Sequence, residues 1–369
     1  MCMMPTDTSD GCKRVLFDNM QQNLYEKITD MNILYQSFHK CKMGVDWKAS
    51  IQRYEANLLP NLTKLRRSLI EGTYKPDRFI EFDVNERGKT RHIKSPSIRD
   101  RVLQRAICDY VLEPVLYSKL IYDNGASVKG KGVEFTRKRL DKHLRDYYRE
   151  HGNKGYILVG DFSKFFESIP HDKLIESLKK HIKDEKMMDL LEMIICSFSD
   201  DGKGLGIGSQ ISQICGIYYP TPLDIYFTSV MGYGKYARHM DDFYAISDDK
   251  EYLKSLLSGA EEIIEELGMK LNKKKTHICR IDKGFIFLKQ YIFITESGKI
   301  VHKPCKSNFV RERRKLKAFK RKLDNKEITL CEIIFTYKSW RNCQVKYDCK
   351  KSIHNMDKLF EQLFRKAVA

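Results

Sequence analysis

The sequence has no long apolar segment, no leader-like start and no closely paired cysteines. No apolar run approaches the roughly 18–20 residues of a membrane-spanning helix. Residues 1–7 have neither the basic start nor the apolar stretch of a secretion signal. The eleven cysteines include no Cys-x-x-Cys pair, which argues against a disulfide scaffold and against a structural zinc site. We therefore expect a protein of a reducing cytoplasm with no membrane partner.

Repeats and flexible linkers are also missing. No internal repeat is visible, and no Pro- or Ser-rich stretch separates large independent domains. The composition, with 42% hydrophobic and 31% charged residues, excludes a disordered chain. At 369 residues, the chain is long enough for two or three subdomains around a real core.

Acidic residues are fewer than basic ones: 49 Asp and Glu face 67 Lys and Arg, so the formal net charge is +18. Nucleic acid is the leading candidate for the polyanion that would explain this excess. The densest basic stretch lies between Lys303 and Lys326, where Leu316, Phe319 and Leu323 recur at helical spacing. The spacing predicts a helix with one buried stripe and a cationic face. The alternative is a solvated face that binds nothing.

The hydrophobic pattern predicts alternating helical and extended segments. Helical patterns cover residues 18–69, 99–116, 133–148, 171–198, 209–230, 250–267 and the basic segment from 303 onward. Extended patterns cover 78–84 and 89–93, which predict a hairpin, and then 156–161, 236–239, 243–246 and 285–294. Glycine-rich loops at 122–132 and 202–208 precede two of the helices.

Three aspartates carry the chemistry that the sequence suggests. Asp161 ends a short buried strand, and Asp241 and Asp242 lie in the bend of a strand–turn–strand eighty residues later. Because adjacent strand residues point to opposite faces, only one of the pair is expected to share a face with Asp161, and the bend favours Asp241. Carboxylates held close together raise each other's pKa unless a cation lies between them. Two Mg²⁺ ions would meet this need and would catalyse an in-line phosphoryl displacement. The alternative is a solvated turn.

Five motifs in a fixed order make the sequence recognisable. They are Ser97–Ala106, Gly160–Phe166, Ile207–Gln213, Ala237–Phe243 and Leu271–Thr276. In this order the chain resembles the bacterial reverse transcriptases, on the side of the group II intron, diversity-generating-retroelement and defence-associated enzymes. The resemblance extends from about residue 23 to the C-terminus.

The resemblance implies an α+β right-hand polymerase. Its parts would be an N-terminal helical region at 1–70, fingers at 71–155, a palm with an antiparallel sheet at 156–295, which has room for a fingers insertion, and a basic helical thumb at 296–369. The implied activity is RNA-directed DNA synthesis from deoxynucleotides with two Mg²⁺ ions, Mn²⁺ being the alternative metal. The implied partners are an RNA template and a DNA product in a bacterial cytoplasm.

The family's functional residues carry over onto matching positions of this sequence. Asp161 and Asp241 would bind the metals, Asp242 would support them as a third catalytic carboxylate, and the backbone of Phe162 would add a ligand. Phe166 matches the aromatic beneath the sugar that excludes a 2′-hydroxyl, with plain core packing as the alternative.

The nucleotide and the primer–template are assigned further residues in the same way. Arg91 matches the fingers arginine that grips the triphosphate, and Lys275 matches the lysine that protonates or neutralises the leaving pyrophosphate. Ser212 and Gln213 match the pair beside the nascent base pair. A second fingers cation is replaced by Asn85, so Arg87 or Lys89 would substitute. Primer and template would contact His239 and the thumb residues Arg313, Arg314 and Lys317.

Two positions depart from the family pattern. His239 stands where the family usually has tyrosine, so nucleotide selection or priming is expected to differ. In the segment Phe287–Tyr291, Lys289 replaces the glycine of the primer grip. These departures leave two alternatives open: a polymerase with relaxed or template-independent addition, and an inactive RNA-binding relative. The biological setting is sequence diversification or antiphage defence, with a dedicated non-coding RNA and with an accessory protein or a second copy of the chain.

Overall fold

A four-stranded antiparallel sheet forms the centre of the computed structural model, which describes residues 23–86 and 88–368. The strand order is β4-β5-β3-β6. The strands are β3 (Tyr156–Asp161), β4 (Tyr236–His239), β5 (Asp242–Ser247) and β6 (His277–Arg280). Residues 1–22, which include the start of the predicted N-terminal helical region, and Arg87 lie outside the described residues.

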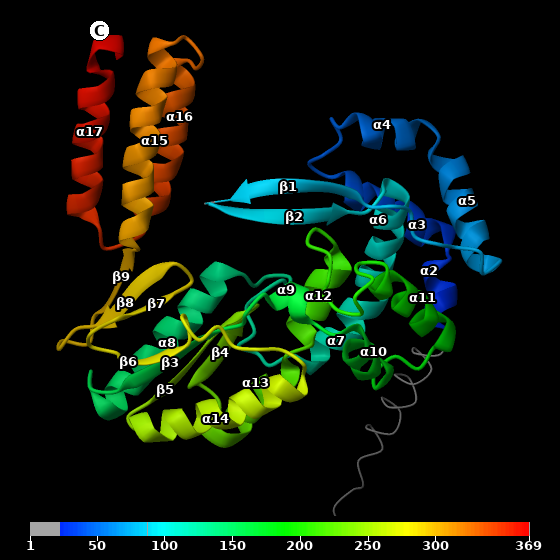
Figure 1. Cartoon of the computed structure of the whole chain (residues 1–369), viewed down its shortest axis with the longest axis horizontal. Helices are drawn as coiled ribbons and strands as arrows, with labels where there is room; N and C mark the ends of the chain where they lie inside the picture. The colour runs from blue at the N-terminus through cyan, green and yellow to red at the C-terminus, as the bar shows by residue number, and fades with distance from the viewer. Residues whose placement is uncertain (1–22, 87, 369) are drawn as a thin grey trace, which may run out of the picture.

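Strands β3, β4 and β5 of the central sheet are mostly buried, whereas the edge strand β6 is partly exposed. Alternate residues of β3 point to opposite sides, and accordingly Leu158 packs in one hydrophobic cluster while Ile157 and Val159 pack in another. The first cluster includes α14 (Lys250–Glu266), and the second includes α8 (Val133–His151). Figure 1 shows α13 and α14 beneath the sheet, away from the C-terminal helices.

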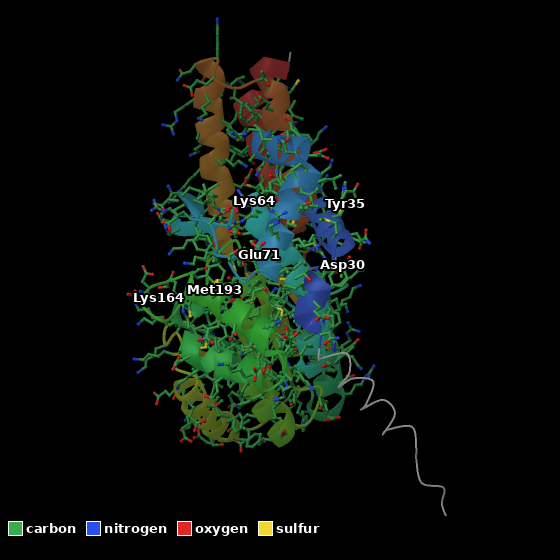
Figure 2. The ribbon with its side chains drawn as sticks, turned by 90° about the vertical axis from the view of Figure 1, so that its right-hand side faces the viewer. Asp30, Tyr35, Lys64, Glu71, Lys164 and Met193 are labelled. Carbon is green, nitrogen blue, oxygen red and sulfur yellow. The ribbon has the colours of Figure 1, made fainter. Side chains whose placement is uncertain are left out.

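The N-terminal part is a helical layer from which a hairpin extends. Its elements are α2 (Leu24–Ile28), α3 (Met31–Lys42), α4 (Ala49–Ala56), α5 (Leu58–Ile70), β1 (Ile80–Glu86), β2 (Lys89–Ser95), α6 (Ile98–Ile107), a π-helical turn (Cys108–Leu112), α7 (Glu113–Leu116) and a 3₁₀ turn (Tyr117–Lys119). The predicted hairpin is confirmed, since β1 and β2 pair antiparallel. In Figure 2, Asp30 and Lys64 mark this layer, with Met193 and Lys164 below it.

Further helices connect this layer to the sheet. They are α9 (Phe165–Ser168), α10 (His171–Lys179), α11 (Glu185–Cys196), α12 (Gln210–Tyr218) and α13 (Thr221–Met231). The single helix predicted over 209–230 is therefore wrong: it is two helices. Pro220 precedes α13 and Pro222 lies in its first turn, and proline supplies no N–H to continue a helix.

The C-terminal part is a small sheet followed by a helical bundle. The sheet is β7 (Phe285–Phe287), β8 (Gln290–Ile294) and β9 (Ile300–Pro304), so the single extended segment predicted over 285–294 is a hairpin. The bundle is α15 (Lys306–Asp324), α16 (Leu330–Gln344) and α17 (Lys350–Val368), with its own hydrophobic core. Figure 1 shows the bundle standing clear of the central sheet, on the side toward which the β1–β2 hairpin points.

The α+β class expected from the sequence is confirmed, with antiparallel sheets and a helical majority. Helix α15 confirms the amphipathic helix predicted in the basic segment, because Leu316 is buried while most of its cations are exposed. Within the described residues, the helices are all too short or too polar to span a membrane. The boundaries of fingers, palm and thumb stay predictions.

Candidate active site

Asp161 and Asp242 lie directly opposite each other at the ends of two paired strands. They are Cα partners in the β3–β5 ladder, and residues opposite each other in an antiparallel pair project to the same face. The expectation that alternation would leave Asp242 away from Asp161 is therefore wrong. Asp241 precedes β5 in the turn and approaches Asp161 from there, so all three carboxylates meet at one end of the sheet.

The turn before β5 is held against the strand that carries Asp161. Met240 has a left-handed backbone (φ +59°), which lets the chain reverse sharply between β4 and β5. The backbone N–H of Phe162 donates to the carbonyl oxygen of Asp241 at 3.3 Å. The hydrogen bond fixes the spacing between the turn and the residue that follows Asp161.

Burial and mutual repulsion raise the pKa of two of the three carboxylates. Burial, followed by the charges of Asp241 and Asp161, raises the pKa of Asp242 to about 7. Burial and the charge of Asp161 also raise the pKa of Asp241. The site therefore holds more negative charge than its own cations neutralise, and this favours an added cation.

Lys275 supplies part of the missing positive charge. Its Nζ donates to both carboxylate oxygens of Asp161, at 2.7 and 2.8 Å. The loop that carries it is fixed by the backbone, since the N–H of Asn272 donates to the carbonyl of Asp161 at 2.8 Å. Burial lowers the pKa of Lys275, but the hydrogen bond and charge of Asp161 raise it overall.

The donor set suits a hard divalent cation. Carboxylate oxygens are the ligands that Mg²⁺ prefers, and burial together with repulsion raises the pKa of two of the three carboxylates here. In the described part of the chain, however, no three acidic, histidine or cysteine side chains form a ready-made metal site. The ammonium of Lys275 is hydrogen-bonded to both carboxylate oxygens of Asp161, so a metal ion that binds Asp161 competes with this ammonium.

Arg91 acts on the same carboxylates from the hairpin. It is exposed on β2, opposite Val84, and its positive charge acts to lower the pKa of Asp241. The hairpin thus brings the predicted triphosphate-binding arginine within electrostatic reach of Asp241. Asn85 accepts a hydrogen bond from Thr90 at 2.7 Å. The proposed substitutes, Arg87 and the side chain of Lys89, lie outside what the structure describes.

Phe166 lies at the edge of the core. Its ring meets Phe165 edge to face at a centroid distance of 5.2 Å and is half-buried. Gly216 of α12 lets the helix approach the ring, because a Cβ there would lie 2.9 Å from Phe166. The ring therefore packs on α12 and still keeps an exposed part, and its role beneath a sugar stays a prediction.

Ser212 and Gln213 of α12 face different environments. Ser212 is 1% exposed, and its hydroxyl has no hydrogen-bond partner among the described residues, whereas Gln213 is exposed. Consecutive helix residues point about 100° apart, so the two cannot meet one ligand in the same way. Gln213 is the member of the pair that solvent reaches.

His239 ends β4 beside the carboxylates. Its Nδ1 is 2.8 Å from the hydroxyl of Thr136 in α8, and burial followed by the charge of Arg238 lowers its pKa. Thr136 therefore fixes the orientation of the ring that replaces the usual tyrosine. The primer or template role of His239 stays a prediction.

The residues expected in the thumb lie in the C-terminal bundle, and the segment expected to grip the primer lies in the small sheet. Arg313, Arg314 and Lys317 are exposed on α15, in the bundle set apart in Figure 1. Leu288 and Lys289 form the β7–β8 turn with φ angles of +45° and +64°. A lysine in the left-handed conformation therefore stands where the family pattern has glycine.

Sequence reasoning missed one element of the site. Arg238 and Asp224 are both fully buried and paired, with Arg238 one residue from His239. An arginine in the short, otherwise mostly apolar strand Tyr236–His239 was the available signal, because a buried charge needs a buried partner. The partner lies on another element, α13, and no local pattern distinguishes it from the other acidic residues of the chain.

The central part of the chain matches a known protein family. Residues 75–292 match the family described as reverse transcriptase (RNA-dependent DNA polymerase). All five motifs lie within these residues, and the resemblance stated from them is confirmed.

The individual relatives share less than a quarter of their aligned residues with this chain. Protein YkfC of Escherichia coli K12 is 24% identical over 275 residues, covering 63% of this chain and 71% of that protein. A Saccharomyces cerevisiae protein named for intron 1 of COX1/OXI3 is 24% identical over 216 residues, covering 54% of this chain and 25% of its own. Among solved structures, Candida albicans telomerase in complex with a fragment of telomeric RNA is 15% identical, with a TM-score of 0.47. The match covers 86% of this chain and 63% of that one.

Proposed function

The chain belongs to the reverse transcriptase (RNA-dependent DNA polymerase) family, and we propose that it adds deoxynucleotides to a primer 3′ end on an RNA template at the site of Asp161, Asp241 and Asp242. One observation carries the proposal. Three carboxylates, from β3, from β5 and from the turn between β4 and β5, meet at one end of the central sheet. Burial together with mutual repulsion raises the pKa of two of them, Asp241 and Asp242. An arrangement that costs stability in this way is typical of a functional site.

Asp161, Asp241 and Asp242 would hold the divalent metal, two Mg²⁺ ions or alternatively Mn²⁺. Bound there, the metal pair supplies stabilisation for the attacking and leaving oxygens of an in-line displacement. The other roles belong to the chain itself. Arg91 would bind the triphosphate through its planar fork of N–H groups, and the ammonium of Lys275 would neutralise the departing pyrophosphate. Phe166 would limit the space beneath the sugar.

Primer extension tests the proposal directly. The full chain is incubated with a DNA primer on an RNA template, the four deoxynucleotides and Mg²⁺, and the products are resolved by length. We expect templated extension by the wild type, none after chelation of the metal with EDTA, and none by Asp161→Asn. The conservative variant keeps the volume of the side chain, so its loss of activity reports on charge rather than on packing. Full activity of Asp161→Asn would reject the site.

A second candidate function is nucleotide addition without a conventional template. His239 favours it, because a half-buried imidazole tied to Thr136 replaces the family's tyrosine beside the carboxylates. The same assay without template distinguishes the two. Extension that needs template supports copying, whereas equal extension with and without template supports relaxed addition. RNA binding with no extension in either arm would indicate an inactive RNA-binding relative.

We further propose that the enzyme works with a dedicated non-coding RNA, in a retroelement or in antiphage defence. The net charge of +18 supports this, together with exposed lysines outside the carboxylate site, among them Lys142, Lys346 and Lys350. Among the neighbouring arginines, Arg145 is exposed as well, whereas Arg139 is paired with Asp123 and Arg137 with Glu134. Structured RNA is bound mostly through its shape and backbone, which distributed cations can contact.

Purification from the native host at about 0.5 M salt tests this, because salt at that concentration largely abolishes non-specific phosphate binding. A single RNA species, encoded beside the gene, would support the proposal. A mixture of ribosomal and messenger fragments would reject it. Proteins that copurify would identify an accessory partner.

A further inference from the structure

Arg238 is a fully buried arginine beside Met240 and Asp241, the turn between β4 and β5, which is named the catalytic turn. Its guanidinium binds Asp224 of α13 through two hydrogen bonds, Nε to Oδ1 at 2.7 Å and Nη2 to Oδ2 at 2.5 Å. Both side chains are 0% exposed. Taking such a pair out of water costs desolvation free energy that can exceed its mutual attraction, so a buried pair is weak evidence of a stabilising role alone.

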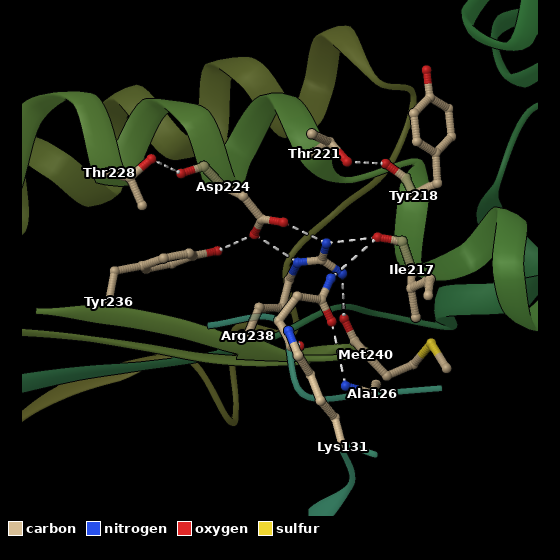
Figure 3. Close-up of polar contacts among 11 residues, drawn as sticks. Ala126, Lys131, Ile217, Tyr218, Thr221, Asp224, Thr228, Tyr236, Arg238 and Met240 are labelled. Carbon is tan, nitrogen blue, oxygen red and sulfur yellow. Dashed lines mark hydrogen bonds and ion pairs between the residues drawn. The ribbon is translucent and has the colours of Figure 1, made fainter. Parts of the chain in front are cut away.

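The remaining N–H groups of Arg238 bind two backbone carbonyls. Nη1 donates to Met240 at 3.0 Å, and Nη2 donates to Ile217 of α12 at 2.7 Å. Figure 3 shows the guanidinium at the meeting point of α12, α13 and the turn that follows β4. One side chain thus ties the catalytic turn to two helices. Lysine could not replace it, because a single ammonium lacks the planar fork.

The carbonyl of Met240 belongs to the strained residue of the turn. Met240 is left-handed at φ +59°, a conformation that a side chain other than glycine adopts only when its surroundings enforce it. The next residue is Asp241, whose carbonyl accepts from the N–H of Phe162. The contact from Arg238 is therefore one peptide away from a carboxylate of the site.

We propose that Arg238 is a positioning residue: by holding the Met240 carbonyl while anchored on Asp224, it sets the turn that places Asp241 and Asp242 opposite Asp161. The inference rests on the proposed function of these carboxylates. A positioning role for Arg238 and a merely structural role predict different results. A structural pair would change the stability of the protein, whereas a positioning residue changes the geometry of the turn and the catalytic rate as well.

The key variant is the double substitution Arg238→Met with Asp224→Leu. Replacing both partners leaves no uncompensated buried charge, and such exchanges are often tolerated. Arg238→Lys is the second variant, and it keeps a positive charge beside Asp224. Tyr236→Phe is the matched control, because the Tyr236 hydroxyl donates to the same Asp224 at 2.8 Å but does not touch the turn.

Two readouts are measured on the full chain. Hydrogen–deuterium exchange at the Phe162 amide reports whether the turn is held, independently of activity. Steady-state primer extension separates kcat from KM for the deoxynucleotide. In the double variant and in Arg238→Lys we expect exchange about tenfold faster and kcat lower by on the order of 10²-fold, with little change in KM. Tyr236→Phe should lower the melting temperature and leave both readouts unchanged.

A rescue completes the test. Adding Met240→Gly to the double variant should recover part of kcat, because glycine adopts the left-handed conformation without strain. The inference is overturned if both Arg238 variants keep wild-type exchange at Phe162 and wild-type kcat. If the double variant does not fold, the exchange rate at Phe162 and the kcat of Arg238→Lys decide whether Arg238 positions the turn. A wild type that adds no nucleotide rejects the proposed function instead, and the exchange data still decide whether Arg238 holds the turn.

Discussion

The ammonium of Lys275 lies 2.7 and 2.8 Å from the two carboxylate oxygens of Asp161. The two residues are 114 positions apart in the chain and come together because the loop after β5 and α14 returns to the end of β3. The chain therefore provides a cation of its own that is hydrogen-bonded to Asp161, and any divalent ion that binds Asp161 competes with it.

Lys275→Met should separate metal binding from catalysis. Removing the competing ammonium should lower the Mg²⁺ concentration needed for half-maximal activity. At the same time kcat should fall by on the order of 10²-fold, since the variant lacks the ammonium assigned to the departing pyrophosphate. A Mg²⁺ titration of primer extension measures both. The exposed neighbour Lys274 provides the control, and an equal effect of Lys274→Met would contradict the assignment.

Asp161→Ala should abolish nucleotide addition without destabilising the fold. The loss of one essential electrostatic group typically costs 10²-fold or more in rate, so we expect at least about that. Because the charge of Asp161 adds to burial in raising the pKa of both Asp241 and Asp242, its removal also relieves an unfavourable interaction. Primer extension and thermal unfolding measure the two effects. More than about a tenth of wild-type incorporation would be inconsistent with a catalytic role.

Phe166→Ala should admit ribonucleotides. If the ring lies beneath the sugar, its removal opens space for a 2′-hydroxyl, and the ratio of deoxynucleotide to ribonucleotide incorporation should fall. Phe165→Ala is the control, since Phe165 is buried beside it and should affect stability alone. An unchanged ratio in a destabilised Phe166→Ala protein would favour the core-packing role.

Lys289→Gly should stabilise the protein. Lys289 is exposed and left-handed at φ +64°, which costs roughly 1–2 kcal/mol for a residue with a Cβ. Part of the gain is offset by the greater freedom of glycine in the unfolded chain, so we expect a net increase of about 0.5–1 kcal/mol in the free energy of unfolding. Urea denaturation measures it. A decrease would show that the lysine side chain contributes to the folded state.

Charge reversal at Arg313, Arg314 and Lys317 should weaken template binding equally across sequences. Removing one cation that binds a phosphate should reduce the log–log salt slope by roughly 0.7–0.9. Binding is measured by fluorescence anisotropy of labelled RNA–DNA duplexes at several salt concentrations. The control is reversal at three exposed lysines at and after the end of α10, Lys179, Lys180 and Lys183. An unchanged slope in the α15 variant would place the binding surface elsewhere.

The sequence by itself determined the local elements and the identity of the family. Apolar periodicity is a local property, and it located the hairpin, the buried strand that ends at Asp161 and the amphipathic basic helix. It also placed Asp241 and Asp242 at a bend between two strands. The order of five motifs predicted the family, because motif order depends only on the chain. Local patterns missed the break at Pro220, where a continuous helix was expected.

Only the tertiary structure decided which of these residues meet. The β3–β5 register, and not alternation along one strand, sets Asp242 opposite Asp161. Packing of α13 on β4 joins Asp224 to Arg238. The environment around α12 buries Ser212 and exposes Gln213, although they are neighbours in sequence. Register, ion pairing and burial depend on elements far apart in the chain, and a single sequence carries no local signal for these distances.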